Sequence, residues 1–115
     1  MLLQIDQSEI RPGIALIALT GRVILGTESL QIETLVADLI SQGRRNFVFD
    51  MSGVTHIDST GIGRFISSYN KVREVSGTLR LAGATGQVRD GFHVTRLDTV
   101  IPFYPDVASA SEGLD

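Results

Sequence analysis

The chain has 115 residues, a net charge of −3 and no cysteine. Its length favours one domain, residues 1–115, built around a single hydrophobic core. The acidic balance gives no electrostatic footprint for nucleic acid or an anionic membrane, and the lack of cysteine excludes disulfides and thiolate metal sites.

The first ten residues do not have the composition of a targeting segment. They lack a basic region and reach Asp6 and Glu9 too early for a signal peptide. No apolar run in the chain approaches the roughly 20 residues that span a bilayer. We therefore expect a cytoplasmic protein with no membrane partner.

Two strands are predicted near the start of the chain. Residues 2–6 alternate loosely between apolar and polar types, and residues 14–20 are apolar almost throughout, which is typical of a central strand covered on both faces. The connection around Pro12 is too short for a crossover, so the two strands should be antiparallel. We expect Gly21 to end the second strand.

Segment 22–27 has two interpretations. In the first, Ile24 and Leu25 enter the core and Thr27 caps the following helix. In the second, the same apolar residues form a docking rim for a partner. The helix itself is predicted over residues 27–42, with Gly43 as a C-cap and a buried stripe at Ile32, Leu35, Val36 and Leu39.

An apolar run at residues 46–50 predicts a buried strand, followed by a turn at Gly53. A second helix is predicted over residues 59–75, because apolar side chains recur there at helical spacing. They are Ile62, Phe65, Ile66 and Tyr69. Asp58, Ser59 and Thr60 come immediately before this stripe, and such residues cap helix starts. We therefore expect Ser59 at the positive end of the helix, with its hydroxyl outward.

This helix start is open to a structural and a functional interpretation. It can be an ordinary N-cap, or it can be a phosphorylation site, because free N–H groups and the helix dipole accommodate a phosphate. Gly61 and Gly63 each cost about 1 kcal/mol relative to alanine in a helix. They are explained either by close packing inside the protein or by the close approach of a partner's backbone.

The rest of the chain continues the alternation of strands and helices. We predict a strand at 78–82, a weaker helix at 85–94, an edge strand at 99–104 containing Pro102, and a short helix from Pro105. The fold class is therefore α/β, a single domain in the order β-β-α-β-α-β-α-β-α with a mixed, mostly parallel sheet of four to five strands and about four helices. The loop carrying Ser59 leaves the carboxyl end of its strand, where sites in such sheets usually lie.

Three short patterns occur in a fixed order along the chain. They are Asp-x-Ser-x-Val at 50–54, Ile-Asp-Ser-x-Gly-x-Gly at 57–63 and Gly-x-Leu-x-Leu at 77–81. With the earlier Leu-x-Gly at 19–21, this set resembles the STAS domain of the anti-sigma factor antagonist (anti-anti-sigma factor) family. In that family, a partner kinase that is itself the anti-sigma factor phosphorylates the serine directly after the Asp, which here is Ser59.

The resemblance implies a phosphorylation-switched binding module that regulates sigma-factor-dependent transcription. Unmodified, it would dock an anti-sigma factor with serine kinase activity, phosphate at Ser59 would release that partner, and a serine phosphatase would reset the switch. The expected partner-binding residues are Asp58, Ser59, Thr60, Gly61, Gly63, Ile24, Leu25 and Thr27. Many family members carry acidic residues after the early glycine, whereas this chain has Arg22 and Leu25 in that loop.

Other functions are weighed against this one. Serine hydrolysis needs a base and an oxyanion hole, but His56 lies only three residues before Ser59 and the G-x-S-x-G pattern is missing, so we do not expect an enzyme. Asp50, His56 and Asp58 form too loose a group for a metal site, and we expect no cofactor. Two alternatives remain: a constitutive STAS scaffold module in which Ser59 is only a cap, and a module that binds a small ligand or nucleotide at the helix start.

Overall fold

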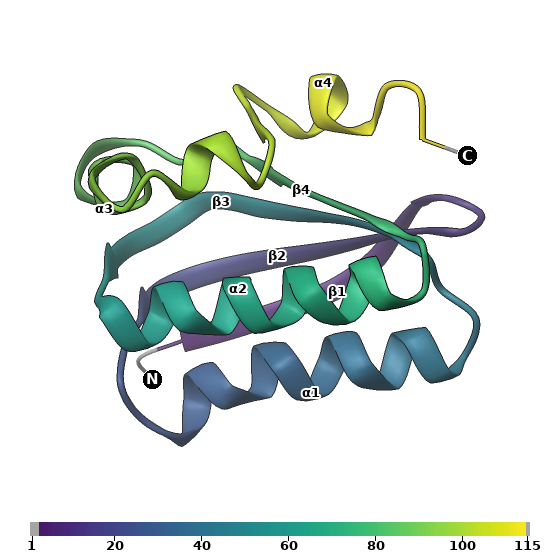
Figure 1. Cartoon of the computed structure of the whole chain (residues 1–115), viewed down its shortest axis with the longest axis horizontal. Coiled ribbons are helices and arrows are strands. Elements are labelled where there is room, and N and C mark those ends of the chain that lie inside the picture. Colours follow the sequence, from purple (N-terminus) through teal and green to yellow (C-terminus); the bar gives the residue numbers. More distant parts are fainter. Residues whose placement is uncertain (1–2, 115) are drawn as a thin grey trace.

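Five strands form one sheet in the computed structural model, which describes residues 3–114 (Figure 1). They are β1 (Leu3–Arg11), β2 (Ile14–Val23), β3 (Asn46–Ile57), β4 (Thr78–Ala82) and β5 (Phe103–Tyr104), arranged in that order. β1 runs antiparallel to β2, and the remaining neighbours are parallel. The mixed, mostly parallel sheet expected from the sequence is confirmed. Residue 2, the predicted start of the first strand, lies outside the described residues.

The helices lie on both sides of this sheet. They are α1 (Thr27–Ser41), α2 (Ser59–Glu74), α3 (Gly86–Val94) and the short α4 (Val107–Ser111), with a 3-10 turn, η1, at Leu97–Thr99. α1 and α2 lie side by side against one face, and α4 lies across the opposite face (Figure 1). The predicted order of elements is confirmed.

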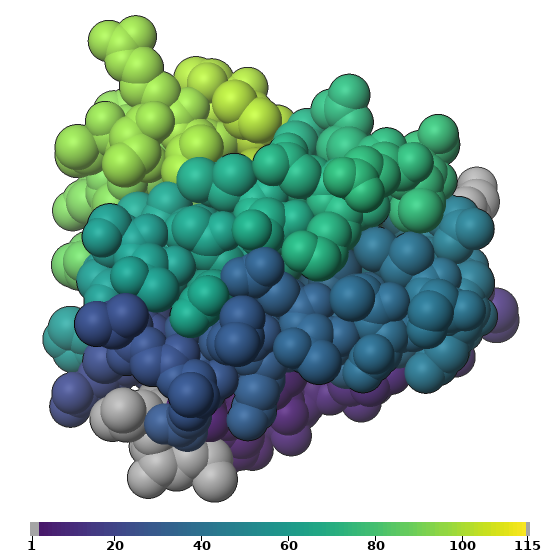
Figure 2. Space-filling view, turned by 60° about the horizontal axis from the view of Figure 1, so that its bottom comes forward, coloured from purple at the N-terminus to yellow at the C-terminus, as the bar shows by residue number. Residues whose placement is uncertain are grey.

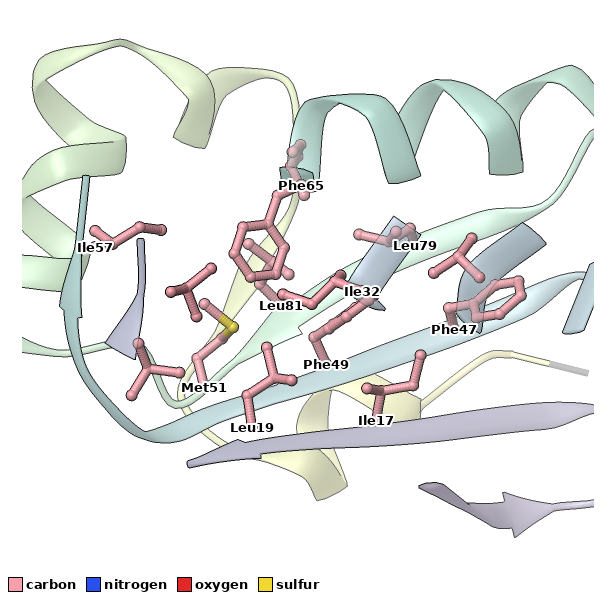
Figure 3. Packing of buried hydrophobic residues seen from close by; sticks show 14 of the residues in the cluster. Ile17, Leu19, Ile32, Phe47, Phe49, Met51, Ile57, Phe65, Leu79 and Leu81 are labelled. Atoms are coloured by element: carbon pink, nitrogen blue, oxygen red, sulfur yellow. The ribbon is translucent and has the colours of Figure 1, made fainter. Parts of the chain in front are cut away.

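The larger core lies between the sheet and the helices α1 and α2 (Figure 3). The predicted stripe of α1 is confirmed, with Ile32, Val36 and Leu39 buried and Leu35 half-buried. In α2, Ile62 and Phe65 are buried and Tyr69 is half-buried. Ile66, which was expected in that stripe, is instead 36% exposed. It follows Phe65 directly, and one residue corresponds to about 100° around a helix, so it lies at the margin of the buried face.

Four aromatic rings connect the elements of this core. Phe65 of α2 lies against Phe49 of β3 with 5.4 Å between ring centroids, and against Phe92 of α3 at 5.7 Å. Phe92 in turn lies 5.1 Å from Phe103 of β5. All three pairs meet edge to face, the arrangement that the ring quadrupoles favour. The rings therefore fix α2, which carries Ser59, against β3 and α3.

A smaller core lies on the other face of the sheet. Ile14, Val48 and Ala82 meet Ala110 and Leu114 there. Two arginines of the sheet bind backbone carbonyls at the end of α4: Arg11 Nη2 donates to Ser111 O at 2.7 Å, and Arg80 Nη1 donates to Glu112 O at 2.8 Å. β2 contributes to both cores, as its continuous apolar sequence predicted.

β2 and β3 extend beyond their predicted ends. β2 continues through Gly21 to Val23, and β3 passes through Gly53 and ends only at Ile57. A Cβ at Gly53 would lie 2.8 Å from the carbonyl oxygen of Leu19, so glycine lets the strands approach where their register shifts. The predicted turn at Gly53 is therefore wrong, because the glycine lies inside the strand.

The predicted strand at 99–104 is also too long. Only Phe103 and Tyr104 pair with β4. Thr99 instead ends η1, which begins after Arg96 in a left-handed conformation with φ of 61°, and residues 100–102 connect η1 to β5. Pro102, immediately before β5, accepts a hydrogen bond from the Leu81 N–H at 3.0 Å through its carbonyl. β5 does lie at the edge of the sheet, where a proline is tolerated.

Candidate functional site

The site begins where β3 passes into α2. Ile57 ends the strand as a buried residue, and Asp58 follows in an extended conformation as the N-cap of the helix. Asp58 Oδ1 accepts a hydrogen bond from the Gly61 N–H at 2.8 Å. The cap is therefore Asp58 and not Ser59, so the interpretation of Ser59 as the cap is wrong.

Ser59 is the first residue of α2 and is exposed to solvent. Its hydroxyl makes no hydrogen bond within residues 3–114. The expected position, at the positive end of a helix with the hydroxyl outward, is confirmed. Because Asp58 caps the helix, the Ser59 hydroxyl is not needed for capping and remains accessible to solvent.

Asp58 also connects α2 to the loop between β2 and α1. Its second oxygen, Oδ2, accepts a hydrogen bond from the Leu25 N–H at 2.9 Å. Desolvation raises the pKa of the Asp58 carboxyl, but hydrogen bonds from the backbone N–H groups of Gly61 and Leu25 lower it, and the resulting pKa lies below its ordinary value. Asp58 is therefore ionised at neutral pH. One of its carboxylate oxygens is bonded to α2 and the other to the loop between β2 and α1.

The position of loop 22–27 differs from the one expected if Ile24 and Leu25 both entered the core. Ile24 is half-buried, but Leu25 is 74% exposed. Thr27 is the first residue of α1 rather than its cap, and the capping position belongs to Gly26, with φ of 141° and no side-chain hydrogen bond. Val23, fully buried at the end of the extended β2, occupies the core position instead. The core-and-cap interpretation is thus wrong for Leu25 and Thr27.

Arg64 holds the same loop from the second turn of α2. Its Nε donates to Ser29 Oγ at 3.1 Å and its Nη2 donates to Gly26 O at 3.3 Å. The guanidinium also pairs with Glu33 of α1 at 3.3 Å. The sequence analysis missed Arg64, because its partners lie 31 to 38 residues earlier in the chain and no local pattern connects them.

Gln87 of α3 fixes the end of β3. Its Oε1 accepts from the Ile57 N–H at 3.0 Å, and its Nε2 donates to the Ile57 carbonyl at 2.9 Å. β4 pairs with β3 only as far as Asp50, so the amide side chain replaces a strand partner here. This residue was also missed by the sequence analysis, and it positions the segment that leads into Ser59.

The two glycines at the start of α2 have different surroundings. A Cβ at Gly61 would overlap the carbonyl oxygen of Val23, so close packing of α2 on the end of β2 requires a glycine there. A Cβ at Gly63 would meet no atom of residues 3–114 within 4 Å. Internal packing therefore accounts for Gly61 but not for Gly63.

A hollow of about 220 Å³ lies in the loop beside Leu25. Its lining consists of Arg22, Ile24, Leu25, Gly26, Thr27, Glu28 and Ser29. Small-molecule pockets usually have volumes of roughly 300 Å³ or more, so this hollow is smaller than most of them. The side chain of Arg22 is exposed and forms no ion pair or hydrogen bond within the described part of the chain.

A family comparison supports the fold. The family model of the STAS domain matches residues 7–110. The chain belongs to the STAS domain family. No curated protein matches this STAS domain.

Solved structures share its architecture. An anti-sigma factor antagonist from Mycobacterium paratuberculosis is 21% identical with a TM-score of 0.79, and the match covers 94% of this chain and 90% of that one. SpoIIAA from Bacillus in its phosphorylated form is 17% identical with a TM-score of 0.72, covering 92% and 96%. A sulfate transporter family protein from Wolinella succinogenes is 15% identical with a TM-score of 0.76, covering 90% and 85%. At these identities the likeness shows the fold.

The described residues contain neither a cluster of metal ligands nor a membrane-spanning helix. Within residues 3–114, no three His, Cys, Asp or Glu side chains come close enough to hold a metal ion. His56 is exposed, and its Nδ1 lies 3.0 Å from Thr55 Oγ1, with no bond to Ser59. None of the helices in the described region is long and apolar enough to cross a membrane.

Proposed function

We propose that this STAS domain is an anti-sigma factor antagonist controlled by phosphorylation of Ser59. The observation that carries the proposal is the exposed, unbonded hydroxyl of Ser59 in the first turn of α2, beside a cap that Asp58 already supplies. In the unmodified state, the surface around Ser59 binds an anti-sigma factor with serine kinase activity and so frees its sigma factor. SpoIIAA, an anti-sigma factor antagonist of the same fold, exists in unphosphorylated and phosphorylated forms, which supports the comparison.

Phosphorylation acts mainly through charge. A phosphate adds about −1.5 to −2 charges beside the ionised Asp58 carboxylate. The Gly61 N–H is already donated to Asp58, so α2 offers the phosphate fewer free donors than its sequence suggested. In a complex, an uncompensated buried charge costs several kcal/mol, and about 2.8 kcal/mol lowers affinity a hundredfold.

The cycle needs two enzymes, and the STAS domain is the substrate of both. The anti-sigma factor transfers the γ-phosphoryl group of a nucleoside triphosphate to the Ser59 hydroxyl, with the nucleoside diphosphate as leaving group, and a serine phosphatase hydrolyses the resulting phosphate ester. Docking and modification use the same surface. The bound kinase therefore phosphorylates Ser59, and the phosphate then causes the complex to dissociate.

The experiment compares Ser59→Ala with Ser59→Asp by isothermal titration against each purified serine-kinase anti-sigma factor of the source organism. Ser59→Ala should bind like the wild type but accept no phosphate, whereas Ser59→Asp should bind about a hundredfold more weakly. Ser76→Asp is the matched control, because Ser76 is an exposed serine just beyond the other end of α2. Equal binding by the wild type and Ser59→Asp would refute the switch.

A constitutive STAS interaction module is the second candidate. It is favoured by the exposed Leu25 and by Arg22, which stand in the loop where many family members carry acidic residues. Mass spectrometry of the protein from its native cells separates the two candidates, because only the switch requires phosphate on Ser59. Binding of a nucleotide or other small ligand at the same place would appear as a ligand-dependent rise in melting temperature.

A further inference from the structure

Gly63 is a helical glycine that packing within residues 3–114 does not require. It lies in the second turn of α2, where glycine is less favourable than alanine. An added methyl group would meet no described atom within 4 Å, in contrast to Gly61, where it would overlap β2. A bare patch of helix backbone is useful where another molecule's main chain comes close.

Gly63 lies on the same surface as Ser59. The two residues are four positions apart, so they share one face of the helix. The next residue, Arg64, binds the Gly26 carbonyl and thereby draws the loop alongside this turn. In the space-filling view, the loop and the start of α2 form one continuous surface at the left end of the molecule (Figure 2).

Leu25 presents an apolar side chain on this surface. It is 74% exposed, although the loop beneath it is fixed by hydrogen bonds to Asp58 and Arg64. A partner that binds to a loop already fixed in this way does not pay the entropic cost of ordering the loop. The hollow beside Leu25 and the unpaired guanidinium of Arg22 extend the same surface.

We propose that the anti-sigma factor lays its main chain directly over Gly63, with an apolar side chain against Leu25 and a carboxylate facing Arg22. This inference rests on the proposed function and defines how the partner docks. The carboxylate is chosen by charge complementarity, since Arg22 lacks a counter-ion in residues 3–114. An acidic partner surface next to Ser59 also repels phosphoserine, so one feature accounts for both binding and release.

The decisive variant is Gly63→Ala, for which stability and affinity should change in opposite directions. The added methyl has room in the free protein and favours the helix, so the urea midpoint should rise. In the complex the same methyl separates the two main chains, so the affinity for the anti-sigma factor should fall about tenfold or more, measured by isothermal titration. A residue with a merely structural role would not combine a more stable fold with weaker binding.

Leu25→Ala provides an independent test, with Val94→Ala as its matched control. Both residues are highly exposed and apolar, but Val94 ends α3 and lies outside the docking surface. Leu25→Ala should lower affinity about tenfold and Arg22→Glu should do the same, whereas Val94→Ala should bind like the wild type.

The outcomes distinguish this inference from the function on which it rests. If Ser59→Asp loses binding while Gly63→Ala and Leu25→Ala bind like the wild type, the docking mode is overturned and the phosphorylation switch stands. If none of the purified anti-sigma factors binds even the unmodified wild type, the proposed function fails, and the docking mode fails with it.

Discussion

The aromatic core beneath α2 and the loop beside its first turn are held by different kinds of contact. The core is close-packed, and Phe49, Phe65 and Phe92 are fully buried in it. The loop is held by hydrogen bonds to Asp58 and Arg64 and leaves an apolar side chain exposed. Removing a ring leaves a void in the interior, whereas removing a polar contact frees a loop and leaves α2 in place. The stability of the fold and the shape of the proposed docking surface can therefore be changed separately.

The largest effect is expected from Phe65→Ala. Phe65 contacts rings on both β3 and α3, and its truncation should lower the free energy of unfolding by about 3–5 kcal/mol, measured by urea denaturation. Ile66→Ala is the control, since Ile66 is the next residue of the helix but partly exposed. Similar losses for the two variants would contradict the assignment of the core.

A smaller but substantial effect is expected from Gly61→Ala. The new methyl overlaps the Val23 carbonyl, so α2 must move away from the end of β2, at a cost of about 1–3 kcal/mol in the free energy of unfolding. Gly63→Ala is the matched variant and should instead stabilise the protein by about 0.5–1 kcal/mol. The free energies of unfolding of the two variants are measured by urea denaturation. If both variants were stabilised, or both destabilised, the claim that Gly61 is packed internally while Gly63 is open would be contradicted.

Replacing Asp58 should have an intermediate effect that depends on pH. Loss of the cap in Asp58→Ala should cost about 1 kcal/mol at pH 7. The pKa of Asp58 is lowered in the folded state, so its stabilising contribution is complete above the ordinary carboxyl pKa near 3.8 and is lost as the pH falls through the folded value. The stability gap between the wild type and Asp58→Asn should therefore narrow as the pH falls toward 3. A gap independent of pH would show that the charge of Asp58 is not involved.

The smallest effect on global stability is expected from Arg64→Ala. Its ion pair with Glu33 is partly exposed, so the free energy of unfolding should change by about 1 kcal/mol or less. The amides of residues 25–27 should nevertheless exchange faster with deuterium, because Gly26 loses its tie to α2. Lys71→Ala is the control, since Lys71 also pairs with Glu33. Unchanged exchange in Arg64→Ala would contradict the role of this side chain in holding the loop.

Local chemistry was sufficient to predict the elements around the site. The apolar spacing of Ile62 and Phe65 predicts a helix whether or not the partners of these residues are known, because the period belongs to the helix itself. The run Asp58–Ser59–Thr60 likewise places a helix start and an outward hydroxyl. The sequence does not determine at which of these three residues the helix begins. In the structure Asp58 is the N-cap and Ser59 is the first helical residue.

The amino-acid sequence by itself determined the order of strands and helices, the mostly parallel sheet and the position of Ser59, because these follow from periodicity and capping within a few residues. Tertiary structure alone decided that Gly61 is buried against β2 while Gly63 is open, and that Leu25 is exposed. It also brought Arg64 and Gln87 to the site from other elements. The physical reason is that steric fit, exposure and hydrogen bonding between distant residues exist only after the chain has folded, so no spacing along the chain records them.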